Sequence, residues 1–115
     1  MYSKPQFLQG VYPFAGQGLT NPHLLSPELT YTVPVGKRTQ FIYFRAGNSA
    51  AEMVYVSLMR DGNPMRLFPI GARGDVHVAL AVVEDLMSGT KLETFIAAPE
   101  NVSGQVVLDI GLVEI

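Results

Sequence analysis

The stretch that decides the fold runs from Arg38 to Phe68 and reads RTQFIYFRAGNSAAEMVYVSLMRDGNPMRLF. Its first two apolar runs, residues 39–46 and 52–60, are dense in aromatic and β-branched residues, which favour strands. The second run is followed by Asp61-Gly62, a dipeptide that supplies the positive φ angles of a tight hairpin. The chain therefore turns back twice within about 30 residues, which indicates antiparallel strands.

The second run is apolar on both faces of the strand that it predicts. Val54, Val56 and Leu58 share one face because side chains alternate along a strand. The opposite face carries Tyr55 and Met59, so neither face is properly polar. Such a strand lies inside a sheet that is covered on both sides, or it is covered by a partner chain.

Composition points to one domain that associates with itself. A length of 115 residues fits a single domain with one core. Charged residues make up 16% of the chain, against roughly 25% in typical soluble domains. One small domain cannot hide so much apolar side chain, so we expect part of it in an interface and predict a homo-oligomer, with a further protein partner as an open alternative.

Several classes of function are disfavoured by composition. The net charge is −2 and the Lys and Arg residues are scattered, so we expect no nucleic-acid partner. There is no cysteine, which excludes disulfides and cysteine-ligated metals. No segment approaches 18 consecutive apolar residues, and the first ten residues do not have a signal-peptide pattern. The sequence thus predicts no membrane span and, by default, a cytoplasmic protein.

Residues 1–28 differ from the rest of the chain because prolines and glycines interrupt every periodic pattern. The segment is nevertheless rich in aromatic residues, which disordered segments lack. We predict an extended arm with one or two short strands, lying over an edge of its own sheet or reaching across to a neighbouring subunit. The candidate interface residues of the arm are Phe7, Tyr12, Phe14, Leu24 and Leu25.

Residues 29–115 read as a β-sandwich domain. Strand patterns follow one another at turn-separated intervals, at residues 29–33, 65–70, 75–83, 91–97 and 105–115 in addition to the two central runs. Pro69 predicts that its strand lies at an edge or ends there, and Gly111 predicts a bulge or bend. Residues 84–90 could form one helical turn. The fold expected is all-β, an antiparallel β-sandwich of jelly-roll type with an extended N-terminal arm.

No motif with a known catalytic or metal-binding mechanism is present. The two histidines, His23 and His77, do not have the spacing of metal ligands, and no serine lies in a nucleophile elbow. Asp61-Gly62-Asn63 resembles the start of a calcium loop but is explained by the hairpin turn alone. We therefore predict no metal site and no cofactor, and the sequence favours a protein that is not an enzyme.

The candidate binding residues are charged or titratable groups near predicted turns: Arg60, Arg66, Arg73, His77, Glu84 and Asp85. Arg60 and Arg66 flank the hairpin turn and could together hold an anion or a carboxylate. The favoured alternative is that these arginines pair with acidic residues of the same chain or of a partner.

Two functions remain open. The first is a non-catalytic, self-associating β-sandwich that serves as a structural or protein-interaction subunit. The alternative is a carbohydrate-binding or small-ligand-binding module whose loops, residues 47–51, 84–90 and 98–104, form a site at one end. Tryptophan is absent, and we expect the hydroxyls of Tyr31, Tyr43 and Tyr55 to be hydrogen-bonded at the rim of the core rather than to form a flat platform.

Overall fold

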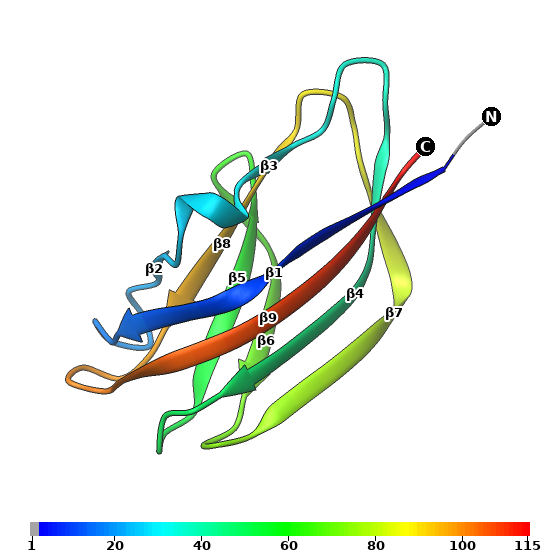
Figure 1. Cartoon of the computed structure of the whole chain (residues 1–115). Helices are drawn as coiled ribbons and strands as arrows, with labels where there is room; N and C mark the ends of the chain where they lie inside the picture. Colours follow the sequence, from blue (N-terminus) through cyan, green and yellow to red (C-terminus); the bar gives the residue numbers. More distant parts are fainter. Residues whose placement is uncertain (1–2) are drawn as a thin grey trace.

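The computed structural model describes residues 3–115, which form two packed sheets (Figure 1). The strands are β1 (Lys4–Ala15), β2 (His23–Leu24), β3 (Tyr31–Thr32), β4 (Thr39–Asn48), β5 (Val54–Arg60), β6 (Asn63–Ile70), β7 (Asp75–Leu86), β8 (Lys91–Ala97) and β9 (Ser103–Glu114). A single 3-10 turn, η1, covers Pro27–Leu29. The predicted all-β class is therefore confirmed.

The strand order identifies a jelly roll. The front sheet, which faces the viewer in Figure 1, has the order β1-β9-β4-β7. The back sheet has the order β2-β8-β5-β6, and β3 pairs with β8 beside this path. All pairings are antiparallel, and in the front sheet earlier strands alternate with later ones, whereas the back sheet ends in the hairpin of β5 and β6. The predicted antiparallel sandwich of jelly-roll type is confirmed.

The core lies between the sheets and is built by the alternation of side chains. Along β9, Val106, Leu108 and Ile110 are all at most 1% exposed and face the back sheet. The two sheets meet around Phe68 of the back sheet, whose ring stacks on Phe44 of the front sheet at a centroid distance of 4.0 Å. Burial of such large rings, together with the aliphatic side chains around them, holds the layers together.

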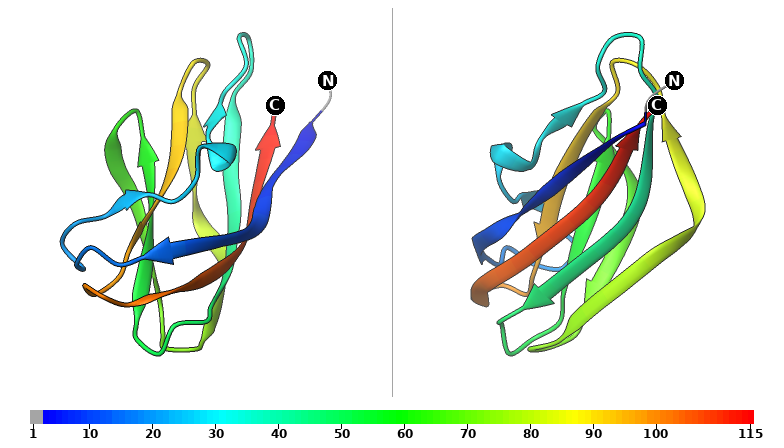
Figure 2. Two further views of the ribbon diagram at one scale, coloured as in Figure 1. Left: turned by 60° about the vertical axis from the view of Figure 1, so that its left-hand side comes forward. Right: turned by 45° about the vertical axis from the view of Figure 1, so that its right-hand side comes forward.

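The first segment of the chain belongs to the front sheet. β1 pairs with β9 along its whole length, from Lys4 opposite Glu114 to Ala15 opposite Ser103. The segment thus lies along an edge of its own sheet, the first of the two alternatives for the arm, and its strand is much longer than the short strands expected. Figure 2 shows β1 and β9 curving together toward one end of the sandwich. Phe14, in this strand, is only 6% exposed.

Several local predictions can be compared directly with the structure. The hairpin turn at Asp61-Gly62 has φ angles of 51° and 83°, as predicted. Pro69 lies in β6, an edge strand, which is also confirmed. The helical turn expected at residues 84–90 is wrong, because β7 continues to Leu86, whose side chain is fully buried.

The pairing of β4 with β9 is irregular at Gly111, where the sequence predicted a bulge or bend. The extra residue of the bulge lies on β4, however, and not on the strand of Gly111. Phe41 pairs with Leu112 and Tyr43 pairs with Gly111, so Ile42 of β4 has no partner on β9. This is the geometry of a β-bulge, which bends the strand and increases its twist. On the other side of β4, Tyr43 pairs with Ala79 of β7.

A buried polar cluster fastens the two sheets together near β3. The Tyr31 hydroxyl donates a hydrogen bond of 2.5 Å to Glu114 Oε2 and lies 2.9 Å from Thr39 Oγ1. Glu114 and Thr39 are register partners on β9 and β4, and both are buried. Burial, and next the hydrogen bond to Glu114, raises the pKa of Tyr31 to about 12. The hydroxyls of Tyr43 and Tyr55 are bonded as well, to Asp109 and to the Leu19 carbonyl, which confirms the expectation for all three tyrosines.

No helix in the described part of the chain has the length and apolar character needed to cross a membrane.

Candidate functional site

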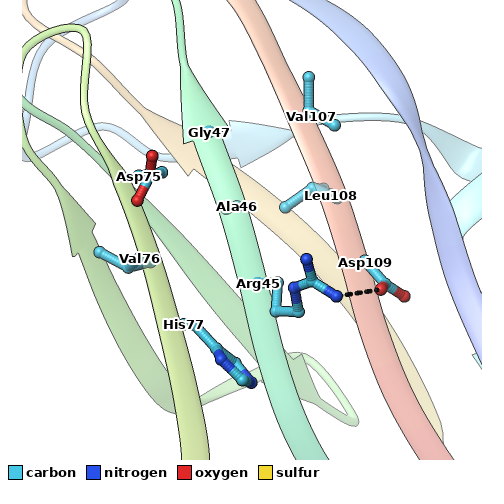
Figure 3. A pocket seen from close by; sticks show the side chains of 9 residues that line it. All are labelled: Arg45, Ala46, Gly47, Asp75, Val76, His77, Val107, Leu108 and Asp109. Carbon is cyan, nitrogen blue, oxygen red and sulfur yellow. Dashed lines mark ion pairs between the residues drawn. The ribbon is translucent and has the colours of Figure 1, made fainter.

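A shallow pocket of about 410 Å³ opens on the front face, by which we mean the surface of the front sheet that points away from the back sheet. Figure 3 shows the strands that form it: β7 on the left, β4 in the centre and β9 on the right. Its lining residues are Arg45, Ala46, Gly47, Asp75, Val76, His77, Val107, Leu108 and Asp109.

Side chains alternate between the two faces of a strand, and this alternation places the polar groups of the pocket in solvent. Arg45 pairs with Asp109 on one side and with His77 on the other, so the three side chains lie on the same face of three adjacent strands. Their chain neighbours, such as Ala46 and Leu108, are buried on the opposite face. The strands that bury the core therefore also present a polar row across the front face.

Asp109 is held in place from two sides. The Tyr43 hydroxyl donates a hydrogen bond of 3.0 Å to Asp109 Oδ1. Arg45 NH1 lies 3.7 Å from Asp109 Oδ2, an ion pair drawn as a dashed line in Figure 3. Burial, followed by the hydrogen bond and charge of Asp109, raises the pKa of Tyr43, while Arg45 opposes the shift. The carboxylate is thus oriented before any ligand arrives, which lowers the entropic cost of binding.

Tyr43 fills the space that Gly111 leaves open. A Cβ built on Gly111 would fall within 3.0 Å of three ring atoms of Tyr43. On its other side the Tyr43 ring meets the His77 ring edge to face, with 6.2 Å between centroids and an interplanar angle of 90°. Tyr43 therefore contacts both Asp109 and His77, which lie on either side of Arg45.

The candidate binding residues from the sequence do not form one cluster. Only His77 lines the pocket. Arg60 and Glu84 are paired with each other at 3.6 Å, across the gap between the two sheets, in agreement with the alternative of pairing within the chain. Arg60 and Arg66 are not opposite each other, since Arg60 pairs with Asn63 across the hairpin.

The other three candidates have separate environments. Asp85 accepts a hydrogen bond of 3.0 Å from Gln40 and lies 3.7 Å from Arg38 Nε. Arg66 lies over the ring of Phe68, 5.4 Å from its centroid. Arg73 is exposed in the turn between β6 and β7. Each is explained by its local contacts or its turn position, so none adds to the pocket.

The three loops proposed for a ligand site do not share one end. The loops at residues 47–51 and 98–104 lie at the same end, where the Gln105 amide donates to the Ser49 side chain. Residues 84–90 lie at the opposite end, because β7 runs antiparallel to β4 and ends where β4 begins. Figure 1 shows the two ends far apart. The prediction that these three loops form one ligand site at one end of the sandwich is therefore wrong.

The candidate interface residues of the N-terminal segment also separate into two groups. Phe14 is buried in the chain's own core, and Tyr12 and Leu25 are partly buried against it. These three side chains are explained without a second subunit. Phe7 is 52% exposed and Leu24 is 37% exposed, so these two are the members of the set that a partner could contact.

Sequence reasoning missed Asp109 altogether and did not connect it to Arg45. One signal was available: Asp109 is the only charge within the apolar run VVLDIGLV of the last strand. A lone carboxylate at that position faces solvent only if its strand is exposed on one side. That Arg45 would lie beside it depends on the pairing of β4 with β9, which a single sequence does not reveal. Within residues 3–115, no three His, Asp or Glu side chains come together as a metal site would require.

Comparisons with known proteins identify the fold. No family model matches the sequence, and no curated protein matches it. The structure is similar to the CBM36-1 domain of a multidomain xylanase from the hindgut metagenome of Trinervitermes trinervoides, with a TM-score of 0.54 and 14% identity over 96% of each chain. It is also similar, with a TM-score of 0.41 and 13% identity, to 30% of an exo-beta-1,3-galactanase from Phanerochaete chrysosporium. At 14% identity the likeness to the CBM36-1 domain shows a shared β-sandwich fold.

Proposed function

We propose that this protein is a carbohydrate-binding module that holds its ligand on the front face, in the pocket between β4, β7 and β9. The observation that carries the proposal is the oriented pair of Arg45 and Asp109, placed in an open pocket beside the ring of Tyr43. The similarity of the whole chain to a module of a xylanase, called a CBM36-1 domain, supports the same class of ligand. Because that similarity concerns the fold, the argument for function depends on the site.

The chemistry of the pocket suits hydroxyl groups. A sugar offers neighbouring hydroxyls that can each donate and accept hydrogen bonds. Asp109 supplies acceptor oxygens and Arg45 supplies donors, and hydrogen bonds to such charged groups are stronger than neutral ones. The apolar side chains of the front face, among them Phe7, Val11 and Val107, are 52 to 58% exposed and can cover the carbon-bound faces of sugar rings.

Affinity electrophoresis in gels containing soluble polysaccharides tests the proposal. We expect the wild-type protein to be retarded by at least one polysaccharide, and Arg45→Ala and Asp109→Ala each to weaken that binding about tenfold or more, because each leaves a charged partner unpaired. Lys37→Ala is the matched control, since Lys37 is an exposed cation on the turn before β4. Retardation that is equal in all four proteins would remove the pocket from the proposal, and no retardation of the wild type would remove the proposal itself.

A second candidate function, self-association, is favoured by a separate surface. The back face, the surface of the back sheet that points away from the front sheet, carries an uncharged row that crosses four strands. Its members are register partners in sequence from β2 to β6: Leu24, Phe95, Ser57 and Leu67. Ser57 is buried within the single chain, so the accessible part of the row lies at its other members. Leu67 is 58% exposed. An uncharged row can meet its own copy across a two-fold axis without placing like charges together.

Sedimentation velocity over the micromolar range tests this second candidate. We expect the wild type to sediment as a dimer and Leu67→Lys to shift the population to the monomer. Val35→Lys is the matched control, because Val35 is 94% exposed on the turn between β3 and β4, outside the row. A wild-type mass equal to one chain throughout the range would exclude self-association and leave carbohydrate binding unaffected.

A further inference from the structure

The polar row of the front face crosses the entire front sheet. Gln9 of β1 pairs with Asp109, Asp109 pairs with Arg45, and Arg45 pairs with His77 of β7. Directly paired residues point to the same face of an antiparallel sheet. With neighbouring strands about 4.8 Å apart, the four positions span about 14 Å. We call these four residues the polar row.

Mostly apolar or small residues border the polar row. On one side the register partners are Val11, Val107 and Gly47, followed by Asp75 on β7, and a Cβ at Gly47 would meet nothing within 4 Å. The row is therefore open to ligand atoms above Gly47. The pocket itself is a shallow trough lined by β4, β7 and β9, and the polar row continues beyond it to Gln9 on β1.

The other border is built from aromatic rings. Phe7 pairs with Gly111, and Gly111 pairs with Tyr43, whose ring fills the space above the glycine. Phe7 is 52% exposed, so its ring is available for contact. A ligand lying along the polar row would have hydrogen-bonding groups beneath it and an aromatic wall on one side.

Both ends of the polar row are open. β1 and β7 are the two edge strands of the front sheet, so the row ends at the sheet edges at Gln9 and at His77. Neither residue is covered, since both are exposed. A chain molecule can thus enter at one edge and leave at the other, and a free chain end is not required.

The charge of the trough favours an uncharged ligand. Arg45 contributes one positive charge, and it is already paired with Asp109. Asp75, at the rim beside Gly47, is a second carboxylate that no lysine or arginine neutralises within the pocket lining. A polymer of acidic sugars would meet more negative than positive charge there, which opposes binding.

Resting on the proposed carbohydrate-binding function, we infer that the front face binds an internal stretch of an uncharged polysaccharide, laid across the strands along the polar row from β1 to β7. Asp109 and Arg45 hold the central sugar units. Gln9 and His77 contact units on either side, which only a ligand long enough to span the sheet can reach.

The test combines ligand charge with ligand length. The neutral probes are mixed-linkage β-glucan, arabinoxylan and galactomannan, and the acidic probes are polygalacturonate and alginate. We expect a neutral polymer to retard the protein and the acidic ones not to. For the sugar oligomers of the bound polymer, titration calorimetry should give an affinity that rises from the disaccharide to the hexasaccharide.

Variants at the two ends of the row decide the orientation. Gln9→Ala and His77→Ala should each lower the affinity for the hexasaccharide by a factor of about 3 to 10, the value of one hydrogen bond, and leave disaccharide binding unchanged. Arg45→Ala should lower both affinities. Gln17→Ala, which removes an exposed glutamine outside the row, is the matched control and should change neither.

Each contrary result has a distinct meaning. Preferential binding of an acidic polymer would overturn the inference while the carbohydrate-binding function stands. Equal affinities for short and long oligomers, with no effect of Gln9→Ala and His77→Ala, would overturn the proposed orientation in the same way. If no polysaccharide binds the wild type, the proposed function and the inference fail together.

Discussion

The ring of Tyr43 occupies the space directly above Gly111, where a Cβ would come within 3.0 Å of three of its atoms. Because the same tyrosine donates a hydrogen bond to Asp109, this packing sets the position of a carboxylate in the candidate site. A residue without a side chain on β9 thus determines the geometry of the pocket on the adjoining strand.

Gly111→Ala should displace the Tyr43 ring and destabilise the fold by about 1 to 3 kcal/mol, since the added methyl has no room. Urea unfolding measures the change. Gly47→Ala is the control, because nothing lies within 4 Å of a Cβ there, and its free energy of unfolding should change by less than about 0.5 kcal/mol. Adding Tyr43→Ala to Gly111→Ala should give a loss smaller than the sum of the two single losses. Additive losses would show that the ring and the glycine are independent.

Tyr31→Phe tests the buried polar cluster between the sheets. At neutral pH the variant leaves the Glu114 carboxylate without its phenol donor, and we expect a loss of about 1 to 3 kcal/mol. The raised pKa of Tyr31 means that the folded chain holds this proton more tightly than the unfolded chain does. Below pH 10.0 both states are protonated. Between pH 10.0 and about 12 the unfolded state releases the proton first, so the stability of the wild type falls.

The advantage of the wild type over Tyr31→Phe should therefore shrink as the pH rises through that window. Urea unfolding of both proteins below and within the window gives the difference, in which the effects of other titrating groups cancel. A difference that stays constant with pH would contradict the role assigned to burial and to Glu114.

For two phenylalanines of β1 we predict opposite effects of alanine substitution on stability. Phe14 is 6% exposed, and Phe14→Ala should cost about 3 to 5 kcal/mol because it leaves a cavity in the core. Phe7 is 52% exposed, and Phe7→Ala should change the stability by less than about 0.5 kcal/mol. Thermal and urea unfolding of both variants provide the comparison. Similar small effects would mean that β1 contributes little to the folded domain.

The ion pair between Arg60 and Glu84 should contribute little to stability although it bridges the two sheets. Their side chains are 46% and 30% exposed, so solvent screens the interaction. A double-mutant cycle with Arg60→Gln and Glu84→Gln should give a coupling energy below about 1 kcal/mol, and added salt should lower it further. A coupling of several kcal/mol, insensitive to salt, would be inconsistent with a surface pair.

The strands β5, β6 and β8 of the back sheet could be predicted from the sequence because their apolar patterns are long and their turns are marked. The strand at Lys91–Ala97 and the hairpin at Asp61-Gly62 are examples. The strand expected at residues 29–33 is reduced to β3, because residues 27–29 form the 3-10 turn. β1 was harder to predict, since Pro5 and Pro13 interrupt its pattern. At a sheet edge every second N–H points to solvent, so prolines are tolerated there and give no sign that the segment is a long strand.

The candidate site could be predicted only in part. His77 was identified, and it does line the pocket. The partnership of Arg45 with Asp109 requires the register between β4 and β9, which is set by the packing of the whole core. The helical turn expected after residue 84 failed for a related reason, since Leu86 is buried and continues the pairing with Thr39. Tertiary contacts outweighed local preference at this point.

The pairing of β1 with β9 has a consequence for biosynthesis. Phe7 finds its register partner, Gly111, only after about a hundred further residues have been made, and of the described strands β9 alone pairs with β1. Until β9 has been synthesised β1 has no strand to pair with, while β5, β6 and β8 of the back sheet can already pair with one another. Closure of the front sheet is then a late event in folding, because it joins strands that are far apart in the sequence.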